Sequence, residues 1–218
     1  MNPGRNRVVL PYDSRHSNGR LSLHRAGEGG AAMPFGSLWL QVIVSAIVVF
    51  VASSILHMAL KYHKADHKRL PSEDAVRDAL GKANLAPGVY FTPYCAEMKE
   101  MNDPAIKQKF EKGPVAMLTV YPKGSPMLPK HLALWFGFCV LTSFVAAYIA
   151  RHTLHPGDDG MLVMRITGTV AFAGYALSSF VDSIWKGQPW ANTARNVADG
   201  VLYAVLTGLV FRLMWPAA

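Results

Sequence analysis

The stretch "LWLQVIVSAIVVFVASSILHMAL", residues 38–60, decides the fold class of this chain. It contains no Asp, Glu, Lys or Arg, and it exceeds the roughly 20 apolar residues that a helix needs to cross a bilayer. Three further long apolar runs follow at residues 131–150, 161–185 and 194–215. Four such runs in so short a chain predict an all-α membrane bundle of four transmembrane helices rather than the core of a soluble domain.

The overall composition agrees with a membrane protein. Hydrophobic residues make up 51% of the sequence and charged residues 17%, whereas an average soluble domain carries about 25% charged residues. The formal net charge of +8 favours contact with anionic lipid. No basic run is interleaved with aromatic residues, so we predict the lipid bilayer as a partner and no nucleic acid.

The segment between the first two predicted spans, residues 61–130, is too long and too patterned for a linker. Apolar residues predict a short helix over 73–83, with Ser72 as its N-cap. Two β-prone runs, 88–94 and 115–122, flank a charged helical stretch. The order helix, strand, helix, strand predicts a small α/β module at the membrane surface.

The first 35 residues are polar, rich in Gly and Arg and without period, which predicts a disordered tail. An alternative is that the chain begins at Met33. In that case the basic residues of the central loop favour a cytoplasmic loop in a multi-pass protein of the inner membrane. With the Arg-rich tail counted, this bias nearly vanishes. The basic residues are Lys61, Lys64, Lys68, Arg69, Lys123 and Lys130.

Three motifs of the central segment carry a resemblance: "EDAVRDAL" at 73–80, "APGVYFTP" at 86–93 and "GPVAMLTV" at 113–120. With the plan of one helix before them and three after, they resemble an uncharacterised family of small bacterial four-helix integral membrane proteins. The resemblance implies a bacterial membrane protein and brings no activity, cofactor or catalytic residue. The histidine-rich exit from the first helix departs from the pattern of that family.

Histidines near the membrane surface suggest a metal site. His63 and His67 are four residues apart, so they share one face if the helix continues through "YHKADHKR". His131 opens the second span and could supply a third ligand for a divalent metal, whereas His57 is expected to face well away from His63. The alternative, which we favour from the sequence, is a cationic helix exit that contacts lipid phosphates.

The last two spans carry ionisable residues, which are costly inside a membrane and often functional. They are Arg165, Asp182, Asp199 and Arg212. In an antiparallel hairpin, Asp182 and Asp199 share one level and the two arginines share the other. We predict interfacial charges at both ends of the hairpin, with an ion or proton path as the alternative.

Small residues form a stripe on the fourth span at Gly200, Ala204 and Gly208, with a shorter counterpart at Gly174 and Ser178. Such a stripe lets another helix approach closely, either within the bundle or on another protomer.

No phosphate-binding loop, nucleophile triad, paired acid and base or zinc-protease motif is present in the sequence. The first functional hypothesis is therefore a non-enzymatic accessory or scaffold protein, whose surface module binds a second copy or another membrane protein. The alternative is a small transporter or metal-handling protein that uses the histidines.

Overall fold

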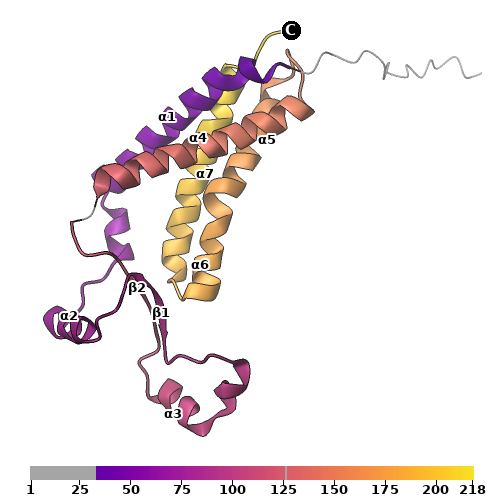
Figure 1. Ribbon diagram of the computed structural model, residues 1–218. Coiled ribbons are helices and arrows are strands. Elements are labelled where there is room, and N and C mark those ends of the chain that lie inside the picture. Colours follow the sequence, from indigo (N-terminus) through magenta and orange to yellow (C-terminus); the bar gives the residue numbers. More distant parts are fainter. Residues whose placement is uncertain (1–32, 126) are drawn as a thin grey trace, which may run out of the picture. The chain divides into compact units, whose positions relative to one another are not determined.

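The computed structural model describes residues 33–125 and 127–218, and the chain over these ranges is mainly helical (Figure 1). Residues 1–32 of the tail predicted over residues 1–35 lie outside the described residues, as does the part of the chain that the alternative start at Met33 concerns. The tail prediction is wrong for its last three residues, because Met33 is buried in the bundle and Phe35 begins a 3-10 turn.

Four helices are long and apolar enough to cross a membrane, as predicted. The first, Gly36–Ala59, combines a 3-10 turn (Phe35–Leu38), α1 (Trp39–Ser54) and a π-helical turn, η2 (Ile55–Ala59). The second is α4 (Leu128–Thr153) and the fourth is α7 (Trp190–Leu213). The third joins α5 (Gly160–Phe172), the π-helical turn η5 (Ala173–Leu177) and α6 (Ser178–Lys186).

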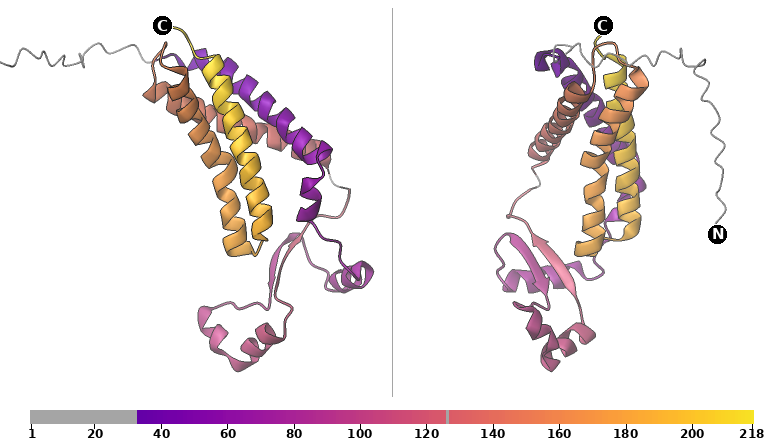
Figure 2. Two further views of the ribbon diagram at one scale, coloured as in Figure 1. Left: turned by 180° about the vertical axis from the view of Figure 1, so that it is seen from behind. Right: turned by 90° about the vertical axis from the view of Figure 1, so that its right-hand side faces the viewer.

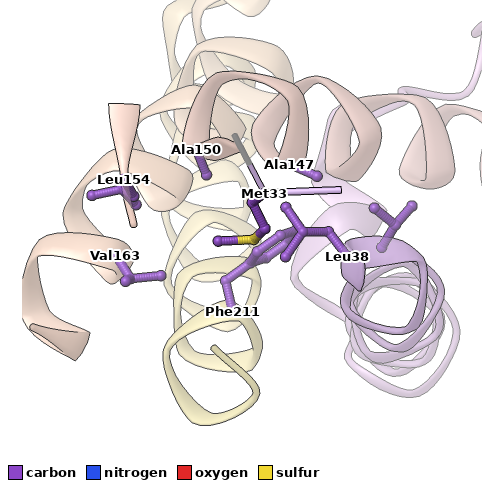
Figure 3. Packing of buried hydrophobic residues seen from close by; sticks show 8 residues of the cluster. Met33, Leu38, Ala147, Ala150, Leu154, Val163 and Phe211 are labelled. Carbon is purple, nitrogen blue, oxygen red and sulfur yellow. The ribbon is translucent and has the colours of Figure 1, made fainter. Parts of the chain in front are cut away.

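These four helices pack on one another. Helix α7 contacts α5 along its length and also α1, and α4 contacts both α1 and α5 (Figures 1 and 2). One buried apolar cluster closes the end of the bundle that holds the α4–α5 turn and the end of α7. There Phe211 meets Met33 and Leu38 (Figure 3). A second cluster, which includes Tyr175 and Tyr203, lies further along the same helices.

The small-residue stripe of α7 packs inside the chain. A Cβ atom added at Gly200 would lie 2.7 Å from the Ala176 Cβ, and one at Gly208 would lie 2.8 Å from the Met164 carbonyl oxygen. Ala204 brings its carbonyl oxygen 3.3 Å from the Cβ position of Gly168. The close approach therefore joins the third and fourth helices of one bundle. Gly174 instead faces Thr142 of α4, and Ser178 is exposed.

The central segment has the predicted order of elements. It contains α2 (Glu73–Lys82), β1 (Gly88–Thr92), a 3-10 turn (Met98–Asn102), α3 (Pro104–Lys112) and β2 (Ala116–Val120). The strands are antiparallel, with Val89 opposite Thr119 and Phe91 opposite Met117. Ser72 holds the predicted N-cap position of α2, but its side chain makes no capping hydrogen bond. No side chain of the described residues 61–125 is buried, so this segment has no core of its own.

A candidate metal centre where the first and last helices meet

The chain leaves the first helix differently from the sequence expectation. The predicted continuous helix through "YHKADHKR" is wrong, because Leu60 adopts an extended conformation and breaks it. A separate 3-10 turn, η3 (Tyr62–Asp66), follows, and His67 is again extended. His63 and His67 therefore do not share a helical face.

This break brings His57 and His63 together, contrary to the expectation that they face apart. Their rings stack with centroids 4.2 Å apart and planes 11° apart. The π-helical turn turns His57 away from its ordinary α-helical direction, and the break at Leu60 lets η3 run back alongside α7. Such π-helical turns are frequent at functional sites.

Three atoms suited to binding a metal converge here: Nε2 of His57, Nε2 of His63 and Oδ2 of Asp199. Asp199 lies on α7 and is buried. Its Oδ2 is 2.8 Å from the His63 Nε2 and 3.8 Å from the His57 Nε2. Two ligands of a tetrahedral zinc ion, each about 2.0–2.1 Å from the metal, lie about 3.3 Å apart. The two oxygen–nitrogen separations fall on either side of that value. The stacked rings would have to tilt from their nearly parallel planes for both Nε2 lone pairs to meet at one ion.

A hydrogen bond at Nδ1 orients the His63 ring. His63 Nδ1 lies 2.6 Å from Oδ2 of Asp66. Because a carboxylate only accepts hydrogen bonds, Nδ1 carries the proton and Nε2 faces Asp199. Asp66 is held in turn by Arg195 of α7, whose Nε and Nη2 both lie 2.6 Å from Oδ1. This carboxylate–histidine arrangement is the usual outer support of a metal-binding imidazole.

His57 is oriented in the same sense. Its Nδ1 lies 3.0 Å from the Ser53 carbonyl oxygen, an acceptor, so Nδ1 again carries the proton. The Nε2 lone pair is left to face the site. Ser53 is fixed by the Trp135 indole, which donates to its hydroxyl at 2.8 Å. Asp199 is fixed as well, since the Tyr62 hydroxyl donates to its Oδ1.

The pKa shifts of the titratable residues of η3 follow from burial and from these hydrogen bonds. Burial alone lowers the pKa of His63, but hydrogen bonds to Asp66 and Asp199 outweigh burial and raise it. Burial raises the pKa of Asp66, but hydrogen bonds from His63 and Arg195 outweigh it and lower it. Burial and the bond to Asp199 raise the pKa of Tyr62. A proton on His63 Nε2 would lie between that nitrogen and Oδ2 of Asp199, in the place that a cation would take.

The structure separates the histidines that the sequence grouped. Of the predicted ligands, His63 belongs to the convergent set of the described residues, whereas His67 and His131 do not. His67 follows η3 with an exposed side chain, and His131 is exposed in the first turn of α4. The residues that take their place are His57 and Asp199.

The charged residues of the last two helices have different surroundings. Asp182 pairs with Lys186 at 2.7 Å near the end of α6. Arg165 is exposed in a shallow apolar groove of α5 and α7, and Arg212 reaches the Met161 sulfur at 4.0 Å. Asp199 differs from these three because it is buried and is bound by Tyr62 and His63. Of the two acids that were expected to share one level of the hairpin, only Asp199 is thus buried among other functional groups.

One sequence signal could have identified His57 and Asp199 as neighbours. In a chain of four spans, the end of the first and the start of the fourth lie on the same side, which places His57 and Asp199 near one end of the bundle. Comparisons of this chain with protein-family models, with curated proteins and with solved structures found no match.

Proposed function

We propose that this chain is an integral membrane protein that binds a divalent transition-metal ion with His57, His63 and Asp199. Two imidazoles and one carboxylate are a ligand set that zinc takes in proteins, with a fourth position left for water or another ligand. Half of the His57 side-chain surface is exposed, which gives an ion access to the site. The function that this supports is metal handling at the membrane boundary.

A single observation carries the proposal. Both imidazoles donate a hydrogen bond from Nδ1 to a fixed oxygen, and both present Nε2 to the same carboxylate oxygen. The double orientation, together with the support of Asp66 by Arg195, matches what metal-binding histidines require.

The test is a metal titration of the detergent-purified full-length protein after chelation. We expect one zinc ion per chain, measured by elemental analysis and calorimetry. The His63→Ala variant should lose the zinc ion. The His67→Ala and His131→Ala variants should retain it, because His67, just after η3, and His131, in α4, lie outside the convergent set. A protein that binds no zinc, copper, nickel or iron, or that loses its ion in the His67→Ala variant instead, would contradict the proposal.

The membrane placement rests on the four apolar helices. We infer a multi-pass protein of a bacterial inner membrane. When residues 1–32 are left out of the count, the basic residues of the loop between the first two helices favour the cytoplasmic side for that loop. Trp135 and Trp190, near the ends of their helices, are at positions typical of the aromatic belts of membrane proteins.

A second function is supported by the β-hairpin. Val89, Phe91 and Met117 lie on one face of it and are exposed, with no element packed over them among the described residues. Two strands alone are marginally stable, so a covering partner would complete the module. We propose an accessory role in which this module binds a second copy or another membrane protein. Crosslinking in native membranes should trap that complex, and a chain that remains a lone monomer would exclude this role.

A further inference from the structure

The third and fourth helices carry a groove on their outer face that the metal centre does not use. It lies between α5 and α7 and has a volume of about 310 Å³, near the lower end of the roughly 300–1,000 Å³ of ligand pockets. The buried Ala204 lies at its base, where its carbonyl oxygen is 3.3 Å from the Cβ position of Gly168. The larger apolar side chains of Met164, Phe172 and Val205 line it from the two helices.

The groove covers the depth of one leaflet of a bilayer. Its lining residues on α5 run from Met161 to Phe172, which is about 16 Å along the helix axis. Half of the hydrocarbon core of a bilayer is about 15 Å thick. Phe172 is also near the midpoint of the third apolar helix, Gly160–Lys186. The outer end of the groove is therefore at the start of α5, and its inner end is near the bilayer midplane.

Two arginines flank the outer end of the groove. Arg165 lines it one turn after Met161, on the same face of α5. Arg212 of α7 donates from Nη1 to the Met161 sulfur at 4.0 Å. Both arginines are exposed, and no carboxylate of the described residues lies within 4.0 Å of either guanidinium. Asp159, the acid at the start of α5, accepts hydrogen bonds from the first backbone N–H groups of that helix instead.

The unpaired charges decide which molecule fits the groove. A charge in a membrane-spanning helix is costly unless an opposite charge accompanies it. An apolar helix of a second copy would cover Arg165 without supplying such a partner. A phospholipid supplies both parts, since its acyl chain matches the apolar lining and its phosphate binds guanidinium groups through paired hydrogen bonds.

We propose that the groove between α5 and α7 binds one anionic phospholipid, whose acyl chain lies between the helices and whose phosphate is held by Arg165 and Arg212. A zwitterionic lipid carries an ammonium group beside its phosphate, which two guanidinium groups repel. An anionic headgroup has no such cation, so the site selects it. The bound lipid also stabilises the native bundle, because the unfolded chain has no groove.

The test titrates the delipidated full-length protein, in a neutral detergent, with phosphatidylglycerol or phosphatidylcholine and counts bound lipids by native mass spectrometry. We expect one phosphatidylglycerol per chain, bound at least about tenfold more tightly than phosphatidylcholine. Arg165→Gln and Arg212→Gln should each weaken phosphatidylglycerol binding by about tenfold or more, because each removes charge-assisted hydrogen bonds. Arg77→Gln, which removes a positive charge from the exposed face of α2, should bind as the wild type does.

A second pair of variants tests the acyl-chain part of the groove without changing charge. Val205→Phe fills the groove and should weaken phosphatidylglycerol binding. Val145→Phe makes the same change at an exposed position of α4 outside the groove and should leave binding unchanged. Circular dichroism and the melting temperature without lipid establish that each variant is folded.

Three results would overturn the proposal: equal affinity for the two lipids, unchanged binding in the two arginine variants, or unchanged binding in Val205→Phe. Inorganic phosphate that raises the melting temperature as much as phosphatidylglycerol does would also overturn it, because the acyl chain would then contribute nothing. Self-association of a chain that retains no lipid would assign the groove to a second copy instead. None of these variants alters His57, His63 or Asp199, so zinc content measured in parallel tests the metal proposal separately.

Discussion

Replacing Asp199 by asparagine is expected to abolish zinc binding while the four-helix fold persists. Asparagine keeps the size of the side chain but removes the negative charge, and a neutral amide oxygen is a poor zinc ligand. Substitution of outer-shell groups costs about 10- to 100-fold in metal affinity, so loss of a direct ligand should cost about 100-fold or more. Calorimetric titration of the chelated protein measures the change.

Asp182→Asn is the matched control. Asp182 is also an acid near the same end of the last two helices, but it pairs with Lys186 and lies outside the convergent set. It should bind zinc as the wild type does. If the two variants lose zinc equally, the effect comes from the general negative charge at this end of the bundle, and the proposed ligand role of Asp199 is wrong.

Replacing Gly208 by alanine is expected to destabilise the bundle strongly for so small a change. The new methyl group would lie 2.8 Å from the Met164 carbonyl oxygen, and a backbone atom cannot move aside as a side chain can. Overpacking of this kind costs about 1–3 kcal/mol. In a chain of this size that lowers the melting temperature by roughly 2–12 °C, since 1 kcal/mol corresponds to about 2–4 °C.

Gly137→Ala on α4 is the control for the glycine substitution. A Cβ atom at Gly137 meets nothing within 4 Å. Alanine should therefore stabilise the helix by about 0.5–1 kcal/mol, because it restricts the unfolded chain and favours helix. Thermal unfolding in detergent compares the two variants. Equal melting temperatures would show that α5 and α7 do not approach as closely as described.

The apolar helices were predictable because length and lack of charge decide them locally. The four spans and the order of elements in residues 61–125 follow from runs such as residues 38–60 and from turn residues such as Pro71. The stripe at Gly200, Ala204 and Gly208 was also visible, but only the structure shows that its partner lies within the chain.

The metal centre was only half predictable. His63 was identified, but its partners depend on how the chain leaves the first helix. A histidine spacing of four is informative only if the helix continues, and the extended Leu60 ends it. The π-helical turn that redirects His57 has no clear sequence signal. Asp199 is far from His63 in sequence, so proximity had to come from the packing of α1 and α7.

The chain positions of the ligands determine when the centre can exist. His63 and Asp199 are 136 residues apart, and they belong to the beginning and the end of the bundle. While the chain is being synthesised, His57 and His63 emerge early and lack their carboxylate until the fourth helix has entered the membrane. At the proposed centre, an ion would therefore find all three ligands only after the last helix is in place. An ion that bound the native state alone would stabilise the completed bundle against loss of that helix.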